Sequence, residues 1–105
     1  MTDPGSRVVV VRRPDEERFI AELDDQLAEL TYRLVGRRLV IVHTGVPAPL
    51  EGRGVGSALV RAAVDWATAE GYTVVPGCPF ARGWLRRHPE AAASVEVDWS
   101  ATPSR

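Results

Sequence analysis

The fold is decided by residues Val40–Ser57, whose sequence is VIVHTGVPAPLEGRGVGS. The apolar run at its start predicts a strand that is buried on both faces. Pro47 and Pro49 then break regular structure, and a glycine-rich turn opens a segment with helical apolar spacing from Val55 onward. Backbone N–H groups at a helix N-terminus, which glycines leave accessible, make an anion site. The stretch therefore predicts a buried strand, a loop and an anion-binding turn.

Four strands are expected up to and including this apolar run. They are Arg7–Arg12, Arg18–Leu23, Gln26–Val35 and Arg38–His43. The third segment also fits a helical stripe of leucines. Its place between two short turns, and its β-prone Thr-Tyr pair, favour a strand. The four strands are therefore predicted to form a meander.

A helix, a strand and a second helix are expected after the glycine turn. The first helix runs from Val55 to a terminal glycine, Gly71. Tyr72–Val75 is a short strand, Phe80–His88 is a short helix, and a last strand is expected within Ala91–Trp99. The unit from 38 to 75 should be a right-handed parallel crossover. The predicted fold class is α/β (α+β), with a mixed central sheet, an antiparallel N-terminal meander, one parallel β-α-β crossover and two main helices.

The composition is that of one soluble globular domain. All 105 residues are assigned to it, with 1–6 and 100–105 expected to be disordered. A formal net charge of -1 argues against an obligate nucleic-acid partner. No apolar run reaches the roughly 18 residues of a membrane span. One cysteine excludes an internal disulfide and indicates a reducing cytoplasm. The 13 basic residues are all arginine, which excludes chemistry that needs lysine, such as a Schiff base.

The glycine turn, Gly52-Arg53-Gly54-Val55-Gly56, matches neither common nucleotide-binding pattern. Its last glycine falls one residue early for the dinucleotide fingerprint, and the lysine of a P-loop is missing. The turn is either a flexible loop into a helix or a pyrophosphate cradle built from the N–H groups of residues 53–57. The turn alone leaves both interpretations open.

Two side chains with catalytic chemistry follow the two parallel strands. His43 ends one strand and Cys78 lies just after the other, so both are expected at the edge where α/β sheets bind ligands. A helix N-terminus lowers a thiol pKa, which makes Cys78 a candidate nucleophile or proton-transfer residue; a lone cysteine is also often a small buried hydrophobe. His43 is a candidate base beside it, or a structural histidine. His88 is expected to cap a helix, and no metal site is indicated.

Four short motifs together resemble a known family. They are His43-Thr44-Gly45-Val46-Pro47, the glycine turn, Pro76-Gly77-Cys78-Pro79 and Arg86-Arg87-His88-Pro89. In this order and spacing, over roughly Arg18–Glu90, they are similar to the very short members of the GNAT N-acetyltransferase superfamily. The resemblance implies a minimal GNAT-like fold that binds acetyl-CoA, with Cys78 as the catalytic residue.

The resemblance also implies where acetyl-CoA would bind. Its pantetheine arm would lie between the two parallel strands, and its pyrophosphate on the glycine turn. The chain departs from the family pattern at Glu51, where larger members have Arg or Gln, and at Gly45, where the subgroup has an acidic residue. The tyrosine acid of many larger members is missing from the last helix, so Cys78 or His43 would take its role. The implied cofactor-binding residues are Thr44, Val46, Arg53, Gly54, Val55, Gly56, Ser57 and Pro79.

The expected function is acetyl-CoA-dependent N-acetyl transfer to an unidentified amine, either a small molecule or a peptide. The amine attacks the thioester directly, or Cys78 is transiently acetylated; both routes remain open. One alternative is a CoA-binding or interaction module with little catalysis, and another is an anion-binding adaptor in which Cys78 only fills the core. No metal, nucleic acid or membrane is expected as a partner, and we expect a monomer or weak homodimer.

Overall fold

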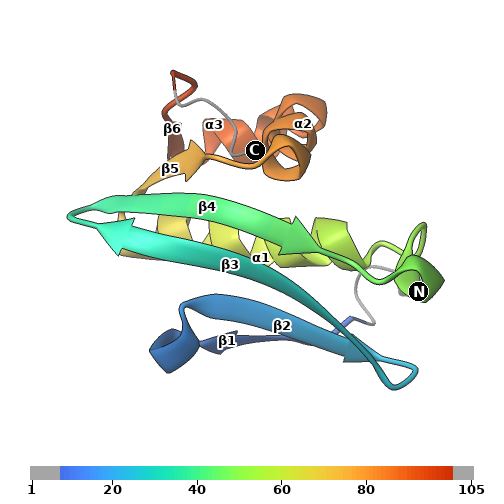
Figure 1. Cartoon of the computed structure of the whole chain (residues 1–105). Coiled ribbons are helices and arrows are strands. Elements are labelled where there is room, and N and C mark those ends of the chain that lie inside the picture. The colour runs from blue at the N-terminus through green and yellow to red at the C-terminus, as the bar shows by residue number, and fades with distance from the viewer. Residues whose placement is uncertain (1–7, 101–105) are drawn as a thin grey trace.

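A computed structural model describes residues 8–100, which form a six-stranded sheet and three α-helices (Figure 1). The elements are β1 (Val10–Arg13), η2 (Pro14–Glu16), β2 (Arg18–Leu23), β3 (Gln26–Val35), β4 (Arg38–Gly45), η3 (Ala48–Leu50), α1 (Val55–Glu70), β5 (Thr73–Pro76), α2 (Pro79–Arg87), α3 (Pro89–Ala93) and β6 (Glu96–Val97). The strands lie in chain order. The pairs from β1 to β4 are antiparallel, whereas β4–β5 and β5–β6 are parallel. The predicted fold class is confirmed.

Strand β3 is extended over ten residues, so the helical alternative for this segment is wrong. Its buried residues alternate, with Ala28, Leu30 and Tyr32 facing the core. Leu27 lies on the opposite face and is 44% exposed, because successive side chains of a strand point to opposite faces. The short turns on either side of β3 thus predicted a strand correctly, whereas the spacing of its leucines suggested a helix.

Helix α1 crosses one face of the sheet and packs on β1 through β5 (Figure 1). It ends at Gly71, whose φ of 75° is a conformation that favours glycine. Arg37, in the turn between β3 and β4, donates to the backbone carbonyls of Glu70 and Gly71 and so satisfies the end of the helix. The buried residues of α1 are Val55, Gly56, Leu59, Val60, Ala63, Val64 and Ala67.

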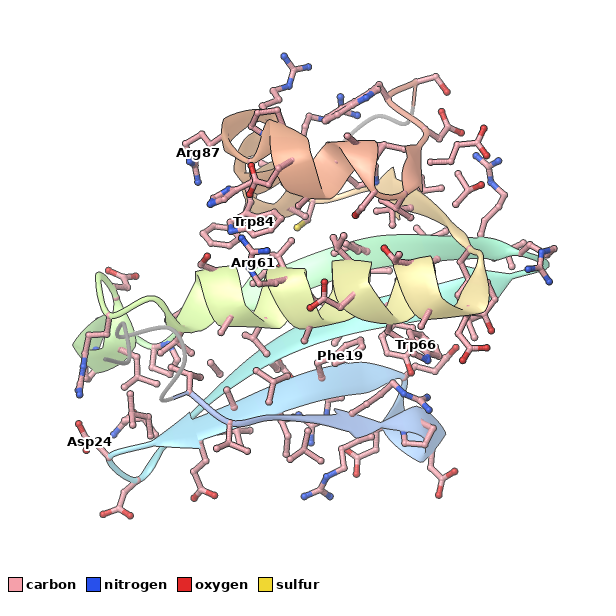
Figure 2. All side chains as sticks on the ribbon, turned by 180° about the vertical axis from the view of Figure 1, so that it is seen from behind. Phe19, Asp24, Arg61, Trp66, Trp84 and Arg87 are labelled. Atoms are coloured by element: carbon pink, nitrogen blue, oxygen red, sulfur yellow. The ribbon has the colours of Figure 1, made fainter. Side chains whose placement is uncertain are left out.

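Aromatic side chains pack α1 against the antiparallel meander of β1 to β4. The Trp66 ring lies 5.3–5.9 Å, centroid to centroid, from the rings of Phe19, Tyr32 and Tyr72. The Arg12 guanidinium lies 4.2 Å from the Trp66 ring centroid, a cation–π geometry. Figure 2 shows Phe19 and Trp66 meeting between helix and sheet. Trp66 therefore packs against the core, as the sequence predicted.

The C-terminal part is more structured than the sequence predicted. Helix α3 was not expected, and the last strand is only Glu96–Val97. Asp98 then pairs with Arg38 of β4. Hydrogen bonds from the Ser100 hydroxyl and N–H, and then from Arg38, lower the pKa of Asp98. Ser100 was expected to be disordered and is instead tied to Asp98; the expectations for 1–6 and 101–105 lie outside the described residues.

No helix within the described part of the chain is long and apolar enough to cross a membrane.

We predict that Leu30→Ala lowers the free energy of unfolding by about 2–5 kcal/mol, because Leu30 is fully buried at the centre of the core. Leu27→Ala, on the other face of the same strand, should change it by no more than about 0.5 kcal/mol. Urea denaturation followed by circular dichroism measures both. Equal losses for the two variants would contradict the register of β3.

Candidate functional site

The site begins where β4 and β5 part. Their parallel pairing runs from Arg38 and Thr73 to Ile41 and Pro76, and β4 continues beyond it to Gly45. Figure 1 shows the two ribbons diverging from there. Within residues 8–100, no strand pairs with the β5-facing edge of the last residues of β4. The site therefore contains a short length of free strand edge.

Gly77 fixes the point of divergence. Its N–H donates to the Ile41 carbonyl at 2.9 Å. A Cβ added to Gly77 would lie 2.9 Å from the same carbonyl oxygen, closer than real Cβ atoms approach. Only glycine lets the chain leave β5 at this place, which explains the glycine between Pro76 and Cys78.

A bulge in β4 decides which side chains face the site. Tyr32 of β3 pairs with Ile41 and Thr31 pairs with His43, which leaves Val42 as an extra residue in β4. One extra residue exchanges the faces of all residues that follow it. Thr44 therefore shares the core face with its partner, Leu30, and His43 points to the opposite face.

The free edge of β4 forms one wall of the site, and the N-terminus of α1 forms the second. Gly52 and Gly54 both have a φ of 79°, so the turn relies on residues that adopt left-handed backbone. No side chain of residues 8–100 caps the helix. The first helical bond is donated by Ala58 to the Gly54 carbonyl at 3.0 Å. The N–H groups of the first turn, residues 55–57, are thus the donors that an α-helix leaves without a partner of its own.

A cleft of about 480 Å³ lies between these two walls. The Phe80 side chain of α2 forms part of its lining, and its ring would lie 2.7 Å from a Cβ added to Gly56. Glu51, the departure from the family pattern, also lines the cleft. The lining residues are Thr44, Val46, Leu50, Glu51, Gly52, Gly54, Val55, Gly56, Ser57 and Phe80.

The structure gathers six of the eight expected cofactor-binding residues around this cleft, and Arg53 and Pro79 lie apart from its lining. The Arg53 guanidinium donates to Asp24 in the β2–β3 turn at 2.5 Å, so its side chain is directed toward the meander (Asp24 is labelled in Figure 2). Pro79 is the exposed first residue of α2. Leu50 and Phe80 also line the cleft and were not predicted from the sequence. The position of Phe80, directly after the Cys-Pro pair, was a signal that could have identified it.

Cys78 is buried behind the cleft. It is 4% exposed and occupies the N-cap position of α2. Its Sγ accepts a hydrogen bond from the Ala81 N–H at 3.4 Å and lies 3.5 Å from Thr44 Oγ1. Thr44 lines the cleft and Cys78 does not, so the cysteine adjoins the cleft through Thr44. The expected position of Cys78, at the sheet edge just before a helix, is the position observed.

The expectation that His43 lies beside Cys78 is wrong. The bulge at Val42 turns His43 onto the sheet face that α1 does not cover, and the residue is exposed. A Cβ added to Gly45 would lie 3.2 Å from His43 Nε2 and 3.9 Å from Glu29 Cγ, so all three residues meet on that face.

Arg18 extends this group on the open face. Its guanidinium donates to Glu29 and to Glu16, at 2.6 Å each. These hydrogen bonds, that of Glu16 first and that of Glu29 second, raise the pKa of Arg18.

His88 has the capping role that the sequence predicted. It follows the last residue of α2, and its Nδ1 lies 2.8 Å from the Trp84 carbonyl oxygen. Trp84 is 1% exposed and thus belongs to the core, as expected. Its indole N–H donates to Ser57 Oγ at 2.7 Å, which connects α2 to the first turn of α1.

Comparison with known proteins places these features in a family. A family model described as GCN5-related N-acetyl-transferase matches residues 18–95. This chain belongs to the GNAT family. Family and fold together support acetyl transfer in general as the chemistry of this GNAT domain.

Relatives of the GNAT domain span both vertebrates and bacteria. Protein NATD1 from Xenopus tropicalis is 29% identical over 90 residues, 83% of each chain. Protein NATD1 from Homo sapiens is 33% identical over 63 residues, 59% of this chain and 56% of the human one. An NMR structure of a GCN5-like protein from Staphylococcus aureus is 29% identical and matches with a TM-score of 0.67, over 90% of this chain and 95% of that one.

We predict that Gly54→Ala destabilises the domain by about 1–2 kcal/mol, because its φ of 79° is costly for a residue with a Cβ. Gly83→Ala is the control: Gly83 lies inside α2, where alanine is favoured by up to about 1 kcal/mol. A Cβ there would meet only the flexible end of Arg87. Thermal unfolding of the two variants should shift in opposite directions; a Gly54→Ala variant as stable as the parent would contradict the turn.

Proposed function

We propose that this GNAT domain binds acetyl-CoA in the cleft between β4 and α1 and transfers its acetyl group to an amine. The observation that carries the proposal is the cleft itself. It joins a free strand edge, an uncapped helix N-terminus and a glycine turn with two left-handed residues. An extended amide chain that ends in a pyrophosphate has groups that match the edge and the helix start.

The pyrophosphate is assigned to the start of α1. Phosphate oxygens accept hydrogen bonds, and the N–H groups of Val55, Gly56 and Ser57 are donors at the positive end of the helix dipole. The turn can approach an anion closely because Gly52 and Gly54 have no side chains. Arg53 is not part of this assignment, because its N–H donates to the Leu50 carbonyl at 3.3 Å and its side chain pairs with Asp24.

The pantetheine arm is assigned to the free edge of β4. Its two amides can pair with backbone groups of residues 42–45, as an added strand would. Thr44 and Val46 supply side chains to this part of the cleft. The thioester would then lie near Thr44, whose hydroxyl is 3.5 Å from Cys78 Sγ.

Direct attack by the amine is the route that this geometry favours. The amine nitrogen forms a bond to the thioester carbonyl carbon, the carbon–sulfur bond breaks, and the CoA thiolate takes a proton. Cys78 can supply that proton through the Thr44 hydroxyl. A covalent acetyl-cysteine needs Sγ to reach the carbonyl carbon, whereas Cys78 is buried and does not line the cleft.

His43 is assigned a role separate from Cys78. It lies on the open sheet face, beside Gly45 and Glu29. An amine that approaches the divergence of β4 and β5 from that face passes His43, which can accept the proton that the amine loses. The acceptor would thus enter from the face opposite the cofactor cleft.

Titration calorimetry with CoA tests the binding proposal. We predict saturable binding, and Glu51→Gln should tighten it about fivefold, because a carboxylate in the cleft repels the pyrophosphate by roughly 1 kcal/mol at short range in water. Glu70→Gln is the matched control and should leave the affinity unchanged. Glu70 is the last residue of α1, about 24 Å from the start of the helix, which is beyond the Debye length. The absence of heat at millimolar CoA would end the proposal.

The role of Cys78 is tested by intact mass and by turnover. Incubation with acetyl-CoA should leave the mass of the parent protein unchanged. With an amine found by an acceptor screen, Cys78→Ala should release CoA about 100-fold more slowly, as for loss of a general acid. Cys78→Ser, which keeps a proton donor, should lose less. One added acetyl group that is missing in Cys78→Ala would overturn direct attack.

A CoA-binding module with little catalysis is the second candidate function. It is favoured by the burial of Cys78 and by the lack of tyrosine in α2. CoA binding without release of CoA in the presence of any amine of the screen would select it.

A further inference from the structure

We propose that Trp84 is a positioning residue that makes the Ser57 hydroxyl a hydrogen-bond donor to the bound phosphate. The inference rests on the proposed function, because it adds a side-chain donor to the assigned pyrophosphate site. It concerns a residue outside the cleft lining, on a different helix from the glycine turn.

The direction of the Trp84–Ser57 hydrogen bond follows from chemistry. Indole N–H is a donor only, so Ser57 Oγ must be the acceptor at 2.7 Å. A serine hydroxyl has one hydrogen to donate, and this bond does not use it. Among residues 8–100, the bond to Trp84 is the one that the Ser57 side chain makes. Its hydrogen therefore remains for a ligand.

A ligand that uses this hydrogen must be an acceptor. Ser57 lines the cleft in the first turn of α1, beside the backbone N–H groups assigned to the pyrophosphate. A phosphate oxygen is an acceptor and carries negative charge, so it suits a hydroxyl whose lone pair is already occupied. Trp84 thus selects the donor orientation of Ser57 before the cofactor arrives, which lowers the cost of ordering it on binding.

Trp84 itself is held firmly in place. It is 1% exposed, and the His88 ring stacks on it at 4.0 Å with an interplanar angle of 16°. The Arg61 guanidinium lies 5.1 Å from the Trp84 ring centroid. Figure 2 shows Arg61 of α1 and Trp84 of α2 adjoining each other between the two helices. These contacts therefore fix the orientation of the indole N–H toward Ser57.

The test is a double-mutant cycle on CoA affinity. Trp84→Phe keeps an aromatic ring next to His88 and Arg61 and removes the N–H donor together with the five-membered ring of the indole. It should weaken CoA binding about fivefold, and Ser57→Ala should weaken it by a similar factor or more. In the Ser57→Ala background, Trp84→Phe should have no further effect. Trp66→Phe, at the aromatic cluster between α1 and strands β2 and β3, is the control and should leave CoA affinity unchanged.

The outcomes separate the two proposals. If the parent protein binds CoA and Trp84→Phe binds it equally well, the positioning role is wrong and the proposed function stands. Equal weakening by Trp84→Phe with and without Ser57 would also overturn it, since that pattern indicates a general structural loss. If the parent protein does not bind CoA, the proposed function fails and this inference fails with it.

A second readout covers the case in which Trp84→Phe does not fold. In the NMR spectrum of the parent protein, the indole N–H signal of Trp84 should shift on saturation with CoA, because its acceptor gains a new partner. The indole signal of Trp66 should stay in place. A Trp84 signal that does not respond to saturating CoA would overturn the inference.

Discussion

The parallel pairing of β4 with β5 ends at Ile41 and Pro76, and the site depends on that end point. Gly77 turns its N–H back to the Ile41 carbonyl and leaves no room for a Cβ. Beyond it, β5 gives way to α2 while β4 continues to Gly45. The free edge of β4, the N-cap position of Cys78 and the opening of the cleft all follow from this one termination.

Packing on the sheet face that α1 covers fixes the two helices that border the cleft. Trp66 fastens α1 to the meander, and Arg37 satisfies its last carbonyls. Trp84 fastens α2 to the first turn of α1 through Ser57. The two helices that border the cleft are thus held by different contacts, one to the sheet and one to each other. A ligand in the cleft finds its donors already oriented, which favours binding without a large rearrangement.

Sequence patterns predicted the architecture well because each element carried a local signal. Gly71 and the proline-containing loop predicted the bounds of α1. The short turns around β3 predicted a strand, although the spacing of its leucines also fitted a helix. Most of the cleft was also predictable, since its residues adjoin the glycine turn. The position of His43 was not, because the bulge at Val42 has no local signature: valine suits a regular strand, and only the partner strand reveals the extra residue.

Long-range side-chain contacts were the other features that the sequence concealed. Arg53 lies inside the predicted cradle, yet its side chain pairs with Asp24 from a turn distant in sequence. The contribution of Trp84 to Ser57 likewise depends on how α2 docks on α1. Such contacts join residues 27 or more positions apart, and no spacing rule applies to them.

In the proposed function, the cleft between β4 and α1 holds the CoA moiety. Titration of the ¹⁵N-labelled protein with CoA, followed by backbone amide NMR, tests it most directly. The largest shifts should fall on the amides of Val55, Gly56 and Ser57 and on residues 42–45, with little change in β1 and β2. Saturable shifts concentrated elsewhere, or no shifts at millimolar CoA, would contradict it.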